Sequence, residues 1–223
     1  MNNSFDKIFE SELATLLQYP TGAGGKFIIN CLSFHPRFHP QTPCFLEEVD
    51  ERIEYITREL NDYDGYNWND LNMGCMQFFN VESLDPYVEG TEVTAHRADI
   101  KRNSFTTVFP CISKNLHFFK TTHTPQQAEF YQRVWPNAKR IVMINCEAFI
   151  AARNGKCYRD WKVRDMLEGI ELDGAFLFDA KTLLEWDALS REYERLLAWF
   201  GYSPDNMDKI RSFHADYIRT IIG

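Results

Sequence analysis

Apolar residues gather in short runs whose spacing alternates between strand-like and helix-like. Residues 13–19 (LATLLQY) form an apolar run that meets a cluster of proline and glycine, which is typical of a buried strand. Residues 26–34 (KFIINCLSF) follow the glycines and are predicted to continue as a helix. Residues 45–60 carry an apolar stripe at helical spacing and predict an amphipathic helix.

The second half of the chain repeats this alternation. The predicted strands are residues 116–120, 140–144 and 175–178. The predicted helices are residues 126–135, 146–153, 182–200 and 204–222, the third of them closed by Gly201. Residues 73–115 mix apolar pieces with polar turns and are expected to form irregular loops with one or two short helices.

Strands that alternate with helices predict an α/β fold. We expect a three-layer, P-loop-like fold with a mostly parallel central sheet flanked by helices. The sequence has no internal repeat, no low-complexity segment and no clear linker, so residues 1–223 are expected to form a single domain.

Composition narrows the class of protein. The chain is 44% hydrophobic and 25% charged, as soluble globular proteins are, and its net charge of −8 argues against broad binding to nucleic acid or to an anionic membrane. Its six cysteines are scattered without CxxC pairs, so we expect no disulfide framework and no metal site. No apolar run reaches the roughly 20 residues of a membrane span, and the first residues lack a secretion signal, which together predict a cytoplasmic protein.

Residues 20–27 (PTGAGGKF), between the first predicted strand and helix, suit a phosphate. Glycines let several backbone N–H groups converge on one anion, and a helix N-terminus adds its positive dipole end. The residues expected to contact the phosphate compound are Thr21, Gly22, Ala23, Gly24, Gly25, Lys26 and Phe27. A tight turn with a solvated lysine would also account for this segment.

The triphosphate-binding P-loop has the pattern G-x-x-x-x-G-K-[ST]. Gly25 and Lys26 match its last glycine and its lysine, whereas Pro20 occupies the first glycine position. Phe27 replaces the hydroxyl residue that binds Mg²⁺ in the triphosphate site. The loop therefore suits a donor that needs no metal ion at this position.

The loop resembles the 5′-phosphosulfate loop of sulfotransferases that use 3′-phosphoadenosine-5′-phosphosulfate (PAPS). Three further segments follow in the order of that family. Residues 120–125 (KTTHTP) are similar to the segment that carries the catalytic histidine, and residues 136–153 (PNAKRIVMINCEAFIAAR) to the strand and helix that bind the 3′-phosphate. Residues 176–202 (FLFDAKTLLEWDALSREYERLLAWFGY) resemble a C-terminal segment of bacterial members.

The resemblance implies a role for each matching residue. His123 would be the catalytic base, Lys26 would hold the 5′-phosphosulfate, and Lys120 would partner the bridging oxygen. The family's arginine at the end of the strand is Asn145 here, and its serine on the following helix is Arg153, so these two would serve the 3′-phosphate. Without a ligand, His123 could instead cap the following helix, Lys120 could be a solvated strand end, and Arg153 could pair with a helix dipole.

Three functions follow as hypotheses. The first is transfer of a sulfuryl group from PAPS to a hydroxyl or amine of a small-molecule or glycan acceptor, without nucleic-acid or membrane partners. The second is a catalytically silent protein that keeps the sulfotransferase fold for binding or assembly. The third is a metal-independent nucleotide-binding protein. Neither the acceptor nor the oligomeric state can be inferred from these residues.

Overall fold

The computed structural model describes residues 9–20, 22–38, 92–103, 115–152 and 172–222. The predicted helix at residues 45–60, together with Thr21 and Arg153, lies outside these residues.

One central sheet joins the described strands. They are β1 (Ala14–Gln18), β2 (Phe118–Thr122), β3 (Lys139–Ile144) and β4 (Phe176–Asp179). Their order across the sheet is β2-β1-β3-β4, and every neighbouring pair is parallel. In the β1–β2 register Ala14 lies opposite Phe118 and Gln18 opposite Thr122, so the carboxyl ends of these two strands meet.

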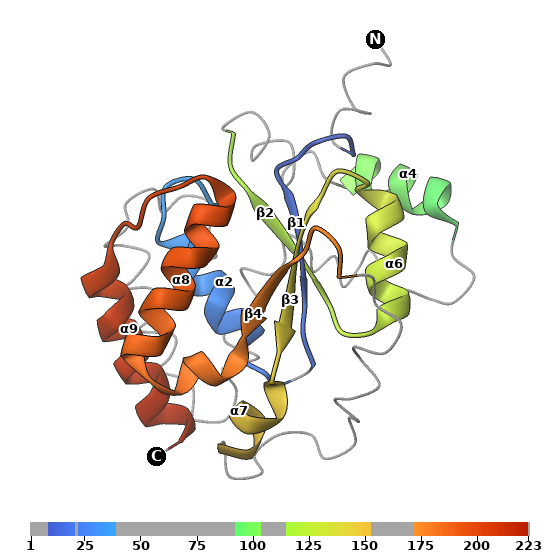
Figure 1. The fold of residues 1–223 in the computed structure, drawn as a ribbon. Helices are drawn as coiled ribbons and strands as arrows, with labels where there is room; N and C mark the ends of the chain where they lie inside the picture. Colours follow the sequence, from blue (N-terminus) through green and yellow to red (C-terminus); the bar gives the residue numbers. More distant parts are fainter. Residues whose placement is uncertain (1–8, 21, 39–91, 104–114, 153–171, 223) are drawn as a thin grey trace.

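Helices cover both faces of the sheet (Figure 1). One face carries α2 (Gly25–Ser33), α8 (Trp186–Phe200) and α9 (Met207–Ile221). The other carries α4 (Val93–Asn103) and α6 (Pro125–Val134). The short α7 (Cys146–Ala152) follows β3 at the carboxyl edge. The predicted three-layer α/β fold with a parallel sheet is confirmed.

The buried apolar residues form a separate core on each face. Side chains alternate along β1: Leu17 and Tyr19 point into the larger core under α2, α8 and α9, whereas Ala14 and Leu16 point into the smaller one under α6. Because both faces of β1 are covered, all five of its residues are buried, including the polar Thr15 and Gln18.

The predicted helix at residues 182–200 is wrong at its beginning. The 3₁₀ helix η4 (Ala180–Leu184) comes first, and Glu185, in an extended conformation with φ −137°, separates it from α8. Asp179 stabilises the 3₁₀ turn, because its Oδ1 accepts from the N–H of Lys181 at 3.0 Å and its carbonyl accepts from the Thr182 hydroxyl at 2.6 Å. These local hydrogen bonds compete with a continuous helix.

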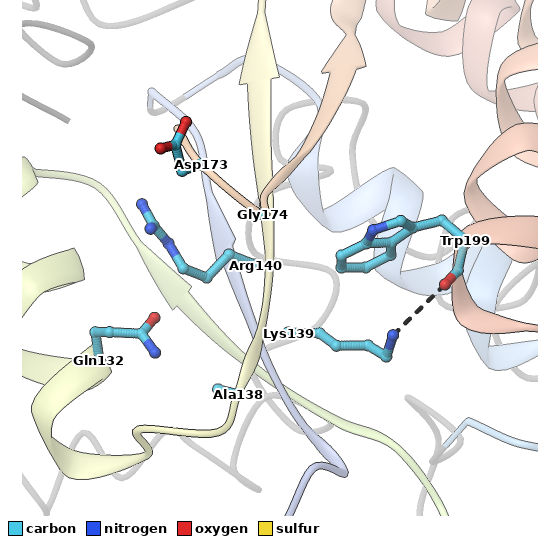
Figure 2. A pocket seen from close by; sticks show the side chains of 7 residues that line it. All are labelled: Gln132, Ala138, Lys139, Arg140, Asp173, Gly174 and Trp199. Atoms are coloured by element: carbon cyan, nitrogen blue, oxygen red, sulfur yellow. Dashed lines mark hydrogen bonds between the residues drawn. The ribbon is translucent and has the colours of Figure 1, made fainter. Parts of the chain in front are cut away.

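The two edges of the sheet differ in chemistry. The glycine-rich segment, α7 and η4 lie at the carboxyl edge, where parallel sheets usually bind ligands. At the amino edge, a pocket of about 430 Å³ opens where β3 and β4 begin (Figure 2). Its lining of charged, polar and aromatic side chains is unlike the glycine-rich segment.

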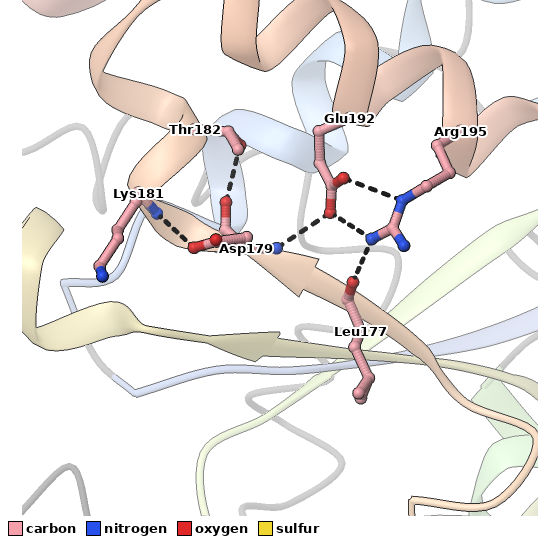
Figure 3. Close-up of polar contacts among 6 residues, drawn as sticks. All are labelled: Leu177, Asp179, Lys181, Thr182, Glu192 and Arg195. Atoms are coloured by element: carbon pink, nitrogen blue, oxygen red, sulfur yellow. Dashed lines mark hydrogen bonds and ion pairs between the residues drawn. The ribbon is translucent and has the colours of Figure 1, made fainter.

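Side chains of α8 cover the outer side of β4 (Figure 3). Glu192 accepts from the backbone N–H of Asp179 at 3.0 Å, and Arg195 donates to the carbonyl of Leu177 at 2.7 Å. The two side chains also pair with each other at 2.7 Å. Glu192 and Arg195 thus satisfy hydrogen-bonding groups of an edge strand.

Candidate functional site

The glycine-rich segment turns the chain from β1 into α2. Gly22 and Gly24 have φ of 88° and 85°, a left-handed conformation that side chains disfavour. The N–H of Ala23 donates to the carbonyl of Pro20 at 3.0 Å, which closes a tight turn. Gly24 is the N-cap of α2, so the helix N-terminus and its dipole begin inside this segment.

Two of the glycines are required by packing. A Cβ on Gly24 would lie 2.6 Å from Leu183 Cδ1, and a Cβ on Gly25 would lie 2.3 Å from the ring of Tyr19. Neither position has room for a methyl group. The segment is therefore pressed onto the core beneath it, and its backbone conformation is fixed before any ligand binds.

His123 lies directly beside the segment. It follows β2, and its Nδ1 is 2.9 Å from the carbonyl oxygen of Tyr19, the residue just before Pro20. The two rings meet edge to face with centroids 4.8 Å apart. The backbone N–H of His123 donates to Gln127 Oε1 at 2.8 Å. Parallel pairing of β1 and β2 thus brings the predicted histidine and the predicted phosphate loop together.

This arrangement fixes the tautomer of His123. A carbonyl oxygen can only accept, so Nδ1 carries the proton and Nε2 of the neutral ring has a lone pair. Burial lowers the pKa of His123; the Tyr19 carbonyl opposes this, and the charges of Lys120 and Lys26 lower it further. The imidazole is therefore neutral near pH 7, with Nε2 as a proton acceptor.

Two lysines complete the site. Lys26 is the second residue of α2 and is half-buried, and Lys120 on β2 holds its ammonium 4.4 Å from the ring centroid of Tyr131. Burial lowers the pKa of Lys120 to about 8, so it is still mostly charged at pH 7. Both charges lower the pKa of His123, with Lys26 at the start of α2 on one face of the sheet and Lys120 against Tyr131 of α6 on the other.

The other predicted site residues lie as follows. The Phe27 ring is buried in the core and stacks on Tyr217 at 4.2 Å, so only its backbone can reach a ligand. Asn145 follows β3 at the same edge, exposed, with a left-handed φ of 55°. Thr21 and Arg153 are outside the described residues.

Two contributors were missed by the sequence interpretation. Tyr19 contacts both Gly25 and His123, and only its place before Pro20 marks it in the sequence. Gln127 orients the backbone of His123, and Thr124, rather than His123, is the N-cap of α6. The Thr-x-x-Gln spacing of residues 124–127 is a capping-box pattern and would have indicated that Thr124 is the N-cap and that the Gln127 side chain turns back to the helix start, where it binds the N–H of His123 rather than that of Thr124.

No protein-family model matches the chain, and no curated protein or solved structure shows significant similarity to it. The described residues contain no helix that is long and apolar enough to cross a membrane. Within the same residues, no three His, Cys, Asp or Glu side chains are grouped so as to hold a metal ion.

Proposed function

We propose that the protein is a PAPS-dependent sulfotransferase that acts on a hydroxyl or amine of a small-molecule or glycan acceptor. The observation that carries the proposal is the contact between His123 and Tyr19, the residue just before the glycine-rich segment: Nδ1 is bound to the Tyr19 carbonyl, and Nε2 remains as the basic atom. A base held beside an anion-binding loop is what in-line transfer from an anionic donor requires.

The donor would bind through the loop. The backbone N–H groups of Gly24 and Gly25, at the N-terminus of α2, suit the 5′-phosphosulfate, and Lys26 adds a full charge. The N–H of Ala23 is used by the turn to Pro20. Phe27 supplies no metal ligand, because its ring is stacked in the core. This supports a sulfuryl donor over a Mg²⁺-nucleotide.

In the reaction, Nε2 of His123 takes the proton of the acceptor hydroxyl while the acceptor oxygen bonds to sulfur. The bond between sulfur and the bridging oxygen breaks, and 3′,5′-adenosine bisphosphate leaves with that oxygen. Lys26 and Lys120 stabilise the negative charge that develops there. General-base catalysis of this kind contributes roughly 10²–10⁴-fold.

A catalytically silent relative is the second candidate, and Asn145 favours it. The position where the family has an arginine for the 3′-phosphate is here a neutral, exposed residue. A protein of this kind would keep the fold and lose tight donor binding.

Calorimetry with 3′,5′-adenosine bisphosphate, 5′-AMP and ATP with and without Mg²⁺ separates these functions. The sulfotransferase proposal expects binding of the bisphosphate without metal, weakened about tenfold or more by Lys26→Gln. Arg133→Gln, which removes an exposed cation in the last turn of α6, is the charge control and should bind normally. No response to any nucleotide would favour the silent protein, and a response to ATP that is equal with and without Mg²⁺, with none to the bisphosphate, would favour a metal-independent nucleotide-binding protein.

Transfer is then measured with radiolabelled PAPS and a panel of phenols, alcohols, amines and oligosaccharides. His123→Asn should bind the bisphosphate normally and lose transfer by roughly 10²–10⁴-fold. Loss of bisphosphate binding in this variant would refute the role of His123 as base.

A further inference from the structure

The side chain of Tyr19 touches both the glycine-rich segment and His123. Tyr19 follows β1 directly, and only 2% of it is exposed. Its ring packs against Gly25, because a Cβ there would lie 2.3 Å from Tyr19 Cδ1 and Cε1. The same ring meets the imidazole of His123, with centroids 4.8 Å apart and an interplanar angle of 88°. One aromatic ring therefore joins the first residue of α2 to the candidate base.

Three consecutive residues at the end of β2 hold Tyr19 in place. Its N–H donates to the carbonyl of Thr122 at 3.1 Å, and its own carbonyl lies 2.9 Å from His123 Nδ1. Its hydroxyl bonds to the side chain of Thr121, and this bond opposes the rise in the pKa of Tyr19 that burial causes. The backbone and the ring of Tyr19 are thus both fixed by residues 121–123.

The basicity of Nε2 depends on how the imidazole of His123 is turned. A neutral histidine side chain in water favours the tautomer with its proton on Nε2, whereas the Tyr19 carbonyl requires that proton on Nδ1. Nε2 is therefore a proton acceptor only while the imidazole stays turned towards that carbonyl. Gln127 binds the backbone N–H of His123. The Tyr19 ring packs against the imidazole itself and restricts its rotation.

We propose that Tyr19 is a positioning residue, whose ring holds the imidazole of His123 in the orientation that leaves Nε2 basic, at a fixed place relative to the start of α2. Because the ring also packs on Gly25, a shift of the helix start is passed on to the imidazole. A misplacement of about 1 Å can cost roughly 10²-fold in rate, so the ring affects transfer by acting through His123. This effect on transfer rests on the proposed sulfotransferase function, whereas the effect on the tautomer does not.

Nitrogen-15 NMR of the histidine side chains in the full chain near pH 7.5 tests the orientation, because the two ring shifts report which nitrogen carries the proton. The signals of His123 are assigned by their loss in His123→Asn. Wild-type His123 should have its proton on Nδ1, and Tyr19→Leu should shift both resonances towards the form protonated on Nε2. Tyr19→Phe keeps the ring and should keep the wild-type shifts. The Tyr19 carbonyl remains in both variants, so wild-type shifts in Tyr19→Leu would overturn the proposal.

A matched control separates this role from core packing in general. Tyr193 on α8 is also buried, and its hydroxyl donates to the carbonyl of Cys31 at 2.9 Å. Tyr193→Leu should lower the melting temperature and leave the His123 resonances unchanged; an equal shift in this variant would overturn the proposal. If Tyr19→Leu does not fold, Gly25→Ala tests the same contact from the other side, because its methyl group would displace the Tyr19 ring. Wild-type His123 shifts in Gly25→Ala would overturn the proposal in that case.

Transfer is measured on the same variants. In Tyr19→Leu kcat should fall roughly 10²-fold while KM for PAPS changes less than about twofold, and Tyr19→Phe should stay within about twofold of the wild type. A rise in KM with kcat unchanged would assign the ring to donor binding and overturn the positioning role. A shifted tautomer in Tyr19→Leu, together with a wild type that transfers nothing, would refute the sulfotransferase and support the positioning role. Transfer by the wild type with no tautomer shift in Tyr19→Leu would refute the positioning role alone.

Discussion

Acid should destabilise this protein through a histidine that is remote from the candidate site. His117 lies between the rings of Phe38 and Phe200, with centroid distances of 5.2 and 4.9 Å, and only 5% of it is exposed. Its Nε2 is 2.9 Å from the Tyr202 hydroxyl. Burial lowers the pKa of His117 from 6.5 to about 4, and the charges of Lys139 and other nearby cations act in the same direction.

The sign and size of the pH effect on stability follow from the difference between the pKa values of His117 in the unfolded and folded chains. The unfolded chain protonates His117 near pH 6.5 and the folded chain near pH 4, so stability is full above pH 6.5 and is lost as pH falls towards 4. The difference of about 2.5 pKa units corresponds to about 3 kcal/mol. Between pH 7.5 and pH 4.5, His117 alone should reduce the free energy of unfolding by about 2.5 kcal/mol.

Other groups titrate in this range, so the assay compares variants. His117→Phe keeps an aromatic ring, and its urea-unfolding free energy should fall about 2.5 kcal/mol less than that of the wild type between pH 7.5 and pH 4.5. Tyr202→Phe removes the hydroxyl and keeps the imidazole, so it should retain the wild-type pH dependence. Parallel curves for the wild type and His117→Phe would refute the reasoning.

Three further predictions concern the loop, the edge strand and the buried lysine. Gly24→Ala should lower the free energy of unfolding by about 2 kcal/mol or more, because strain at positive φ adds to overlap with Leu183. Gly201→Ala, at φ 86° with open space around its Cβ, should show the strain alone, about 1 kcal/mol. Equal losses for the two variants in urea unfolding would contradict the overlap. Glu192→Ala should cost about 2 kcal/mol and speed hydrogen exchange at the Asp179 amide, which unchanged exchange would disprove. Lys120→Met should stabilise the protein by about 2 kcal/mol at pH 7, which is less than the full pKa shift would give because the lysine is half-buried. The gain in stability should shrink as pH rises from 8 to 10.5. A loss of stability at pH 7 would contradict this.

The elements with one dominant signal could be predicted from the sequence. The strand of residues 140–144 is apolar on both faces, and the structure has β3 at Lys139–Ile144. Gly201 ends α8 as expected, with a left-handed φ of 86°. These features depend on local composition and on burial of both sheet faces, which a single sequence reveals.

Two features could not be predicted, one of them set by local hydrogen bonds and the other by a tertiary contact. The break at Glu185 follows from hydrogen bonds around Asp179, which compete with a helical pattern that the sequence alone would continue. The part of Tyr19 in the site is equally hidden, since it acts through its carbonyl and through the space that Gly25 leaves for its ring. A contact made by a backbone carbonyl does not depend on the residue type, so no sequence motif indicates it.

The partnership of Tyr19 and His123 joins residues 104 positions apart in the chain. Contacts of such separation form late in folding, because the entropy of closing a long loop must be met before they add stability. His123 and the glycine-rich segment therefore come together only when β2 has paired with β1. Ligand binding at this site would therefore report completed folding, since chains in which β2 has not paired with β1 would lack the site.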